Sequence, residues 1–524
     1  MLMKIKFLTL LLITVLLFQN NVRSQSVTGS WGDQGNGTYI NPILNADYSD
    51  PDVIRVNDRF YMVCSEFHFM GMPVLESSDM VNWKIIARVY DHFDFPEYNT
   101  NDRYAGGSWA PSIRYHDNKF WIYFCTPDEG LFMSSAEKAE GPWEPLFQVK
   151  AIARWEDPCP FWDEDGKAYL GHSLKGAGPI IIHKMSADGK QLLDDGVTVY
   201  TGPTAEGTKI HKLNGRYYLS IPEGGVAEGW QTILRSGNIY GPYEKKVILE
   251  KGTTSVNGPH QGSLVDTPGG QWWFYHFQSD GAMGRVVHLQ PVIWQDGWPI
   301  AGVDIDRNGI GEPVYVWKKP DIKVDSKITA PQSDDDFNAT SLGLQWQWNH
   351  NPVNDLWSLT EKPGYLVLKA GKADNFVKAH NTLTQKVMGT SGEAITEMDL
   401  SGLADGQKAG LCSMGGKIIN LIGILKRDGQ LYLFTETSGK VTSEKPVRLK
   451  KIFLKVSLDI KGDKNQFLYS SDNKSYATAG EPFTTAAGYW KGTRLGLFSF
   501  NELNIGGIAS FNSFIYNYDG PKGR

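Results

Sequence analysis

The chain has 524 residues, of which 41% are hydrophobic and 12% aromatic, and its formal net charge is −6. A chain of this length and composition can bury a large core, and its size predicts two or more domains. The negative charge and the lack of a basic stripe argue against a nucleic-acid-binding protein. We therefore expect a multidomain globular protein without a nucleic-acid partner.

The first 24 residues have the pattern of a secretory signal peptide. Lys4 and Lys6 precede an apolar stretch, residues 7–18, that is too short to span a bilayer, and the small residue Ser24 offers a cleavage site. The sequence contains no later apolar run long enough for a membrane span. We expect residues 1–24 to be removed and the mature protein, starting near Gln25, to be periplasmic or extracellular.

A repeated pattern runs through residues 25–320. Each of its five copies begins with one leading residue, usually polar or acidic, and continues with a β-rich run. A tight turn of Asn, Asp or Gly and then an aromatic-rich strand follow. Successive copies begin 47 to 60 residues apart, a period near that of propeller blades. The pattern predicts a five-bladed β-propeller whose copies start at Asp50, Ala110, Asp157, Glu206 and Gln261.

Three of these five leading residues are carboxylates: Asp50, Asp157 and Glu206. The first strand of every propeller blade lines the central channel, so the three side chains should meet at one mouth of that channel. Carboxylates brought so close repel one another, which costs stability and favours a functional role. The alternative is that they only cap turns at the starts of strands.

A domain boundary is predicted after Trp317. Residues 318–336 are charged, contain prolines and show weak periodicity, as linkers do. Short alternating segments follow, such as residues 365–368 and 431–434, separated by Gly, Asn and Asp turns. We expect an all-β chain with almost no helix, in which residues 334–524 form a concanavalin-like β-sandwich.

The four cysteines could form two disulfides in an exported protein. Cys64, Cys125 and Cys159 lie in apolar strand contexts, and Cys412 lies far away in the second domain. Their spacing does not match a zinc site. We expect four buried free thiols.

Six segments of the predicted propeller are informative together: Asn41-Pro42-Ile43-Leu44, Asp50-Pro51-Asp52, Trp109-Ala110-Pro111, Asp157-Pro158, Ala205-Glu206-Gly207 and Gly284-Arg285. In combination they resemble glycoside hydrolase family 43. The stretch from Asp336-Phe337 to Trp348-Asn349 is also similar to the start of the sandwich that many members carry. The resemblance implies a five-bladed propeller with a β-sandwich, acting on arabinose- or xylose-containing plant oligosaccharides and polysaccharides.

The resemblance assigns catalytic roles to the three carboxylates. It implies that Asp50 is the general base, Glu206 the general acid, and Asp157 the group that keeps the acid protonated and orients it. Inverting glycosidases need their two carboxyl groups roughly 6.5–9.5 Å apart, a gap that opposite sides of a channel can supply. We expect no required cofactor and no metal at the site, and the sequence leaves open a structural calcium ion.

Five further residues are candidates for binding the sugar: Trp109, Arg285, Phe67, His260 and Trp490. Trp109 and Phe67 could contact the sugar or pack in the core. Arg285 stands where the family has a substrate-contacting arginine, and a surface salt bridge is the alternative. His260 could touch a central metal ion or water, or be a core residue. Trp490 could lie in the core, or close the pocket and favour attack on chain ends.

The resemblance implies an inverting enzyme. An exo-acting α-L-arabinofuranosidase is favoured, because residues 67–73 resemble members that remove arabinose side groups. A β-D-xylosidase or an enzyme with both activities is the alternative. A retaining fructan-type hydrolase is disfavoured, since Ser49-Asp50-Pro51-Asp52 departs from the Asn-Asp-Pro-Asn motif of that class. A binding propeller without activity is disfavoured because all three carboxylates are present.

Overall fold

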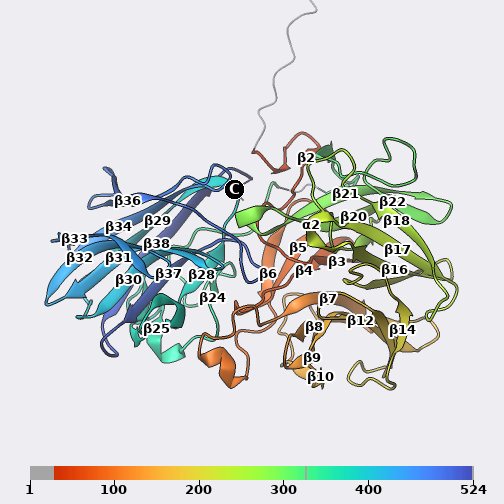
Figure 1. Ribbon diagram of the computed structural model, residues 1–524, viewed down its shortest axis with the longest axis horizontal. Helices are drawn as coiled ribbons and strands as arrows, with labels where there is room; N and C mark the ends of the chain where they lie inside the picture. The colour runs from red at the N-terminus through yellow and green to blue at the C-terminus, as the bar shows by residue number, and fades with distance from the viewer. Residues whose placement is uncertain (1–28, 325–326, 522–524) are drawn as a thin grey trace, which may run out of the picture.

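The computed structural model describes residues 29–324 and 327–521, and these are built of β-strands and loops (Figure 1). This confirms the all-β prediction. No helix in these two ranges is long and apolar enough to cross a membrane. The predicted signal peptide lies outside the described residues. The short helices of the described part are α2 (Gly225–Glu228) and the 3-10 turns η1 (Pro96–Asn99), η2 (Gly281–Met283), η3 (Asn354–Leu356) and η4 (Phe376–Lys378).

Five four-stranded antiparallel sheets follow one another along the chain, one for each repeat of the sequence. Each is a meander, because its strands pair in the order in which they follow along the chain. Two-residue turns join the first two strands in the first, second and fourth of these sheets. The five sheets are β3 (Asp52–Val56), β4 (Arg59–Val63), β5 (Pro73–Ser77), β6 (Lys84–Arg88); β7 (Trp109–His116), β8 (Lys119–Thr126), β9 (Gly130–Ala136), β10 (Phe147–Lys150); β11 (Trp155–Trp162), β12 (Ala168–Leu174), β13 (Ile180–Met185), β14 (Val197–Tyr200); β15 (Lys209–Leu213), β16 (Arg216–Glu223), β17 (Trp230–Ser236), β18 (Glu244–Leu249); and β19 (Leu264–Asp266), β20 (Trp272–Ser279), β21 (Arg285–Gln295), β22 (Trp298–Ala301).

The first strands of these sheets lie next to one another. Strand β7 contacts β3 and β11, β11 contacts β15, and β19 contacts β3. The first and fifth sheets are joined where the Val53 N–H donates to Ser263 Oγ at 2.9 Å. A small sheet of β1 (Gly32–Asp33), β2 (Thr38–Ile40) and β23 (Val316–Lys318) pairs the start of this region with its end. The five sheets are therefore held together by contacts between the two ends of the region.

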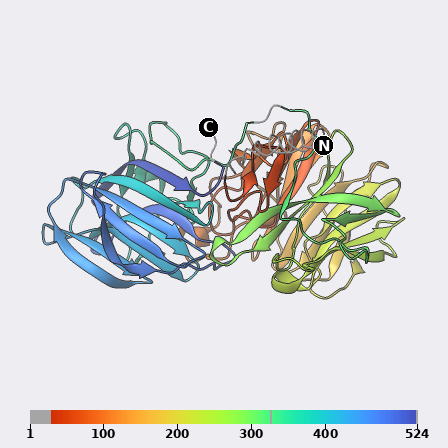
Figure 2. The same ribbon diagram turned by 90° about the horizontal axis from the view of Figure 1, so that it is seen from above.

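Two large sheets form the rest of the molecule, which lies beside the five-sheet region in both ribbon views (Figures 1 and 2). Their strands are antiparallel except for β27, and residues from both sheets share one apolar core. One sheet has the order β24 (Gln347–Trp348), β28 (Leu383–Lys386), β37 (Arg494–Asn501), β30 (Gln407–Gly415), β31 (Ile418–Arg427), β32 (Gln430–Thr437), β33 (Lys440–Val447), with β27 (Gly371–Lys372) beside β37. The other has the order β25 (Trp357–Ser358), β26 (Leu366–Lys369), β38 (Ile508–Tyr518), β29 (Ser391–Asp399), β34 (Lys451–Asp459), β35 (Asn465–Ser470), β36 (Ala477–Phe483).

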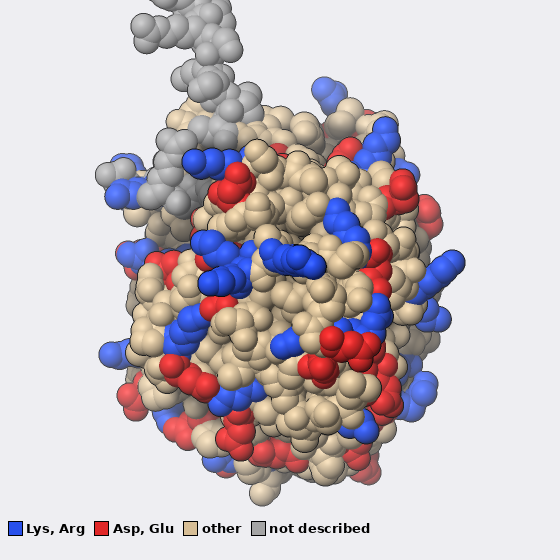
Figure 3. Space-filling view, turned by 90° about the vertical axis from the view of Figure 1, so that its left-hand side faces the viewer, with Lys and Arg blue, Asp and Glu red and all other residues tan. Residues whose placement is uncertain are grey.

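The outer end of this two-sheet region carries charges of both signs. Figure 3 shows Lys and Arg interspersed with Asp and Glu across that face. An extended basic stripe of the kind that tracks a nucleic-acid backbone is not visible there.

All four cysteines are buried and free, as the sequence predicted. Burial raises the pKa of the Cys64, Cys125 and Cys412 thiols. A thiol with a raised pKa forms little of the reactive thiolate. Cys125 and Cys412 thus serve as small apolar residues of the core, whereas Cys159 Sγ accepts a hydrogen bond from Arg114 Nη2 at 2.9 Å.

A buried cluster of charges joins the two regions. Arg494 Nη2 donates to Glu66 Oε2 at 2.7 Å, and Lys386 also pairs with the Glu66 carboxylate. Lys491 Nζ lies 3.1 Å from Asp47 Oδ2 and donates to the Ser65 carbonyl at 2.9 Å. Removing one partner of a buried ion pair leaves an uncompensated charge, which is strongly destabilising. This cluster fixes the loop before β37, which includes Trp490, against the first sheet.

Candidate active site

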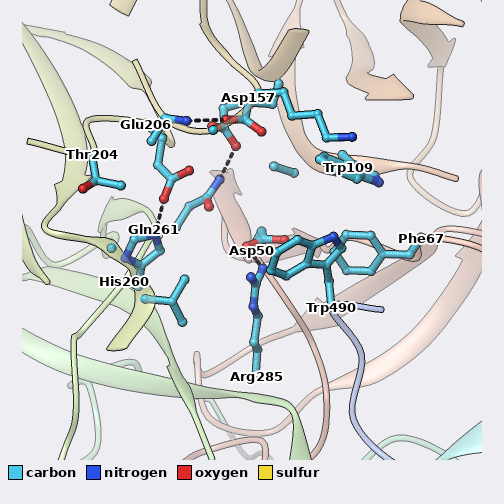
Figure 4. A pocket seen from close by; sticks show the side chains of 17 residues that line it. Asp50, Phe67, Trp109, Asp157, Thr204, Glu206, His260, Gln261, Arg285 and Trp490 are labelled. Carbon is cyan, nitrogen blue, oxygen red and sulfur yellow. Dashed lines mark hydrogen bonds and ion pairs between the residues drawn. The ribbon is translucent and has the colours of Figure 1, made fainter. Parts of the chain in front are cut away.

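One pocket of about 370 Å³ gathers all eight residues that the sequence singled out (Figure 4). The eight are Asp50, Phe67, Trp109, Asp157, Glu206, His260, Arg285 and Trp490. Residues that the sequence did not assign complete the lining: Ala110, Glu156, Lys175, Gly176, Ala177, Thr204, Gly225, Val226 and Gln261. The side chains come from all five four-stranded sheets and from the two-sheet region, so distant parts of the chain build one site.

The backbone turns sharply before or within the first strand of each sheet. Asp50, Ala110, Asp157, Gly207 and Gln261 all adopt a positive φ, between 39° and 64°. Non-glycine residues in this left-handed region are uncommon, and such strain clusters at functional sites. The turn directs the side chains at and just before it into the pocket.

The fourth repeat is registered one residue later than the sequence predicted. Its left-handed residue is Gly207, so Gly207 and not Glu206 is equivalent to Asp50 and Asp157. Glu206 takes the preceding position, which Trp109, Glu156 and His260 hold in other sheets. Glycine adopts a positive φ without a steric penalty, which explains its place at the turn. Asp50 and Asp157 therefore hold the left-handed position of their repeats, whereas Glu206 holds the position just before it.

Asp50 is paired with a cation. Arg285 Nη1 donates to Asp50 Oδ1 at 2.8 Å, and Ser65 Oγ donates to Asp50 Oδ2 at 2.5 Å. The two charged side chains are only 5% and 14% exposed. A guanidinium beside a carboxylate stabilises the negative charge. The contact of Arg285 is thus a buried ion pair within the pocket, and not a surface salt bridge.

Asp157 is held by three neutral donors. Its Oδ2 accepts from Ser173 Oγ at 2.7 Å and from the Gly207 N–H at 2.9 Å, and its Oδ1 accepts from Gln261 Nε2 at 2.8 Å. Burial raises the pKa of Asp157, and the nearby charge of Glu206 raises this pKa further. The protonated form of Asp157 is therefore favoured more than that of an exposed aspartate.

Glu206 lies just before the fourth sheet, and its carboxyl group is directed toward His260 (Figure 4). Its Oε1 lies 2.8 Å from Nε2 of His260, which is almost completely buried. Figure 4 shows Glu206 and Asp157 on one side of the pocket and Asp50 with Arg285 on the other. His260 contacts the Glu206 carboxyl group, whereas the sequence left open a contact with a metal ion or water. Its rigid ring sets the direction in which Glu206 points.

Glu156 is a fourth pocket carboxyl group, to which the sequence assigned no role. It is 7% exposed, and its Oε1 accepts a hydrogen bond from the Ala177 N–H at 3.2 Å. Burial, followed by the charges of Asp157 and Glu206, raises the pKa of Glu156 to about 9. The signal that could have found it is its repeat position, since it precedes Asp157 as Trp109 precedes Ala110.

Aromatic rings line the side of the pocket near Asp50. The rings of Phe67 and Trp109 meet edge to face at 5.8 Å, and the Trp109 indole N–H donates to the Ala105 carbonyl at 3.0 Å. Trp490 is 55% exposed and lies 5.9 Å from the guanidinium of Arg285. Trp490 is therefore a residue of the pocket rim and not of the core.

Two places in the described ranges bear on the calcium ion that the sequence left open. Carboxyl oxygens of Glu156, Asp157 and Glu206 lie within 4.8 Å of one another, but both oxygens of Asp157 already accept hydrogen bonds. The second place is the start of β15, where the buried ammonium group of Lys209 donates to Ser112 Oγ at 2.8 Å. Lys209 already supplies the positive charge at this place. Calcium takes about six to eight oxygen ligands. Neither set of residues fits that requirement.

Two family models match the two regions of the chain. The model described as glycosyl hydrolases family 43 matches residues 39–299. The model described as the beta xylosidase C-terminal concanavalin A-like domain matches residues 334–517. The second match supports the predicted concanavalin-like β-sandwich.

Relatives of known sequence or structure agree with these matches. A protein of Xylanibacter ruminicola with the provisional name beta-xylosidase is 56% identical over 90% of this chain and 88% of its own length. A beta-xylosidase of Formosa agariphila is 40% identical over 95% of this chain and 93% of its own. Arabinofuranosidase names occur at lower identity, as in a Bacteroides ovatus relative at 32% over 65% of this chain and 66% of its own.

A solved structure shares both regions. The bifunctional GH43-CE protein of Bacteroides eggerthii has a TM-score of 0.82 and 30% identity over 92% of this chain. This chain spans 64% of the length of that protein. From the pocket, the two family models and the 56% identical relative we conclude that the chain belongs to glycosyl hydrolase family 43.

Proposed function

We propose that the protein is an exo-acting, inverting β-D-xylosidase that acts on xylose-containing oligosaccharides or polysaccharides. One observation carries the proposal: the cation-paired Asp50 lies across a single pocket from Glu206 and Asp157. The xylosidase names of the two relatives with 56% and 40% identity support the choice of sugar. The α-L-arabinofuranosidase activity that the sequence favoured has less support.

The proposal includes the arrangement of the domains. The five four-stranded sheets are the blades of a five-bladed propeller over residues 25–320, and the first strands of the blades surround its axis. The sandwich extends over residues 334–524. Residues 1–24 direct export and are removed, so that the enzyme meets its glycan outside the cytoplasm.

The chemistry follows from the two sides of the pocket. Asp50 removes a proton from a water molecule, whose oxygen forms a new bond to the anomeric carbon. The bond from that carbon to the glycosidic oxygen breaks, and Glu206 gives its proton to the departing oxygen. Asp157 orients Glu206, because Asp157 Oδ2 accepts a hydrogen bond from the N–H of the adjacent Gly207. Because water attacks from the face opposite the leaving group, the anomeric configuration is inverted.

The shape of the pocket supports attack on chain ends. Trp490 and Phe67 wall one side, and Asp50 and Asp157 lie nearly buried at the base. A closed base accepts a terminal sugar, whereas an open groove would accept the middle of a chain. A terminal xylose would stack on Trp109 and place its anomeric carbon between the two sets of carboxyl groups.

The test is hydrolysis by wild type and Glu206→Gln of xylobiose, nitrophenyl β-D-xyloside and nitrophenyl α-L-arabinofuranoside. We expect the wild type to prefer the xyloside to the arabinofuranoside. Glu206→Gln should lose about 10²-fold or more in kcat on xylobiose and less on nitrophenyl xyloside, because nitrophenol leaves without a strong acid. NMR of the first product should show α-xylose.

The control is Glu164→Gln, which changes an exposed glutamate in the turn after β11 and should match wild type. Faster release of arabinose than xylose would overturn the choice of sugar. Retention of the β-configuration would overturn the assignment of Asp50 as a base.

A further inference from the structure

The mechanism above leaves Glu156 without a task. Among the described lining residues it is a nearly buried carboxyl group with a pKa raised to about 9. A buried ionisable group with a strongly perturbed pKa in a cleft is a candidate functional residue. The alternative is that Glu156 only packs in the core. The place of its carboxyl group within the pocket distinguishes a functional role from a packing role.

Glu156 lies between the base of the pocket and its mouth. Its Oε1 is held at 3.2 Å by the N–H of Ala177, in a loop whose neighbouring residues Lys175 and Gly176 are exposed. A carboxyl oxygen of Glu156 also lies within 4.8 Å of oxygens of Asp157 and Glu206. Since Glu206 protonates the glycosidic oxygen, Glu156 lies close to the bond that is cleaved, on the side from which the leaving group departs.

The state of the carboxyl group determines which bond it can make. With its pKa raised to about 9, Glu156 holds its proton at neutral pH and offers an O–H donor. The backbone N–H groups of Ala177 and Gly176 act on this carboxyl group as donors, so the O–H of the protonated form is what it can offer to a ligand. Sugar hydroxyl and ring oxygens are matching acceptors.

We propose that neutral Glu156 donates a hydrogen bond to the sugar unit on the leaving-group side of the scissile bond, and so selects substrates whose leaving group is itself a sugar. This inference rests on the proposed function, because Glu206 must act on the adjoining bond. Lys175, whose Nζ lies 5.0 Å from the centre of the Trp109 ring, forms the outer wall of the same side.

The test compares wild type with Glu156→Ala and Glu156→Gln on xylobiose and on nitrophenyl β-D-xyloside. Xylobiose has a sugar as its leaving group, whereas nitrophenol offers no comparable hydroxyl groups. We expect Glu156→Ala to lose about tenfold in kcat/KM on xylobiose and less than threefold on nitrophenyl xyloside. Glu156→Gln keeps a neutral donor and should stay within about threefold of wild type on both.

Glu164→Ala is the matched control, and Glu156→Met replaces Glu156→Ala if the latter fails to fold by circular dichroism. Equal activity of Glu156→Ala and wild type on both substrates would overturn the inference. So would a Glu156→Gln variant that falls as far as Glu156→Ala with its alkaline pH limb shifted, since an ionised carboxylate would then be acting on Glu206. If wild type cleaves neither substrate, the proposed function fails instead.

Discussion

Asp50 and Asp157 occupy equivalent positions in the first and third sheets, and both have a left-handed backbone, with φ of 55° and 59°. Each also accepts a hydrogen bond from a buried serine through Oδ2. Their other oxygens meet different partners. Oδ1 of Asp50 meets the guanidinium of Arg285, whereas Oδ1 of Asp157 meets the neutral amide of Gln261.

The surroundings extend this contrast. Burial and the charge of Glu206 raise the pKa of Asp157, and burial with the charges of Asp157 and Glu206 raises the pKa of Glu156. One side of the pocket therefore stabilises a negative carboxylate, and the other holds protons. The two sides of the pocket thus hold their carboxyl groups in different electrostatic environments, as paired acid and base groups require. Changes to each side should have separable effects.

The largest effect is expected from Asp50→Asn, which removes the base and leaves the other side intact. The amide cannot accept the proton of water, so kcat/KM should fall by about 10³-fold on both xylobiose and nitrophenyl xyloside. Steady-state kinetics on the two substrates measures this. Asp58→Asn, in an exposed turn of the same sheet, should match wild type. A loss below tenfold would mean that Asp50 is not the base.

Arg285→Met should have the next largest effect, because it makes the two sides of the pocket alike. Without the cation the negative charge of Asp50 is less stable, and kcat should fall by about 10²-fold. Arg285→Lys should restore part of the loss, because it returns a cation beside Asp50. Arg427→Met, at an exposed ion pair of the sandwich, is the control. An Arg285→Met variant with the kcat of wild type would contradict the importance of the pairing.

Glu156→Gln tests the proton-holding side through stability. Burial raises the pKa of Glu156 from 4.5 to about 9, so the folded state binds an extra proton between these values. This contribution to stability is complete below about pH 4.5 and is lost as pH rises toward 9. From pH 5 to 9 the Tm of wild type should therefore fall by a few degrees more than that of Glu156→Gln. Glu164→Gln should follow wild type, and parallel curves for all three proteins would refute the shift.

The smallest effect is expected from Trp490→Ala, at the exposed rim on the side of Asp50. Half of this side chain already faces solvent, so its loss should raise KM about two- to fivefold and change kcat little. Initial rates with xylobiose measure the change. Trp317→Ala removes an exposed tryptophan of β23, away from the pocket lining, and serves as control. Unchanged activity on short substrates would refute a role for Trp490 in closing the pocket.

The sequence predicted much of this site because its repeat is local. Turn residues such as Asn57 and Asn214 lie in the tight turns that the pattern indicated, with φ of 56° and 51°. The same repeat brought Asp50, Asp157 and Glu206 together without any knowledge of distances. It failed by one residue in the fourth copy, because an acidic residue and a glycine stand side by side there and the backbone conformation was not visible.

The order of strands and turns, the all-β class and the family follow from short-range patterns that a single chain displays along its length. The behaviour of each carboxyl group does not, because electrostatic forces act through space between residues far apart in the chain. Arg285 and Asp50 form an ion pair although 235 positions separate them in the sequence. Lys491 binds the Ser65 carbonyl across 426 positions and so holds the loop of Trp490 against the first sheet. Only the folded chain decides which acids meet a cation and which meet one another.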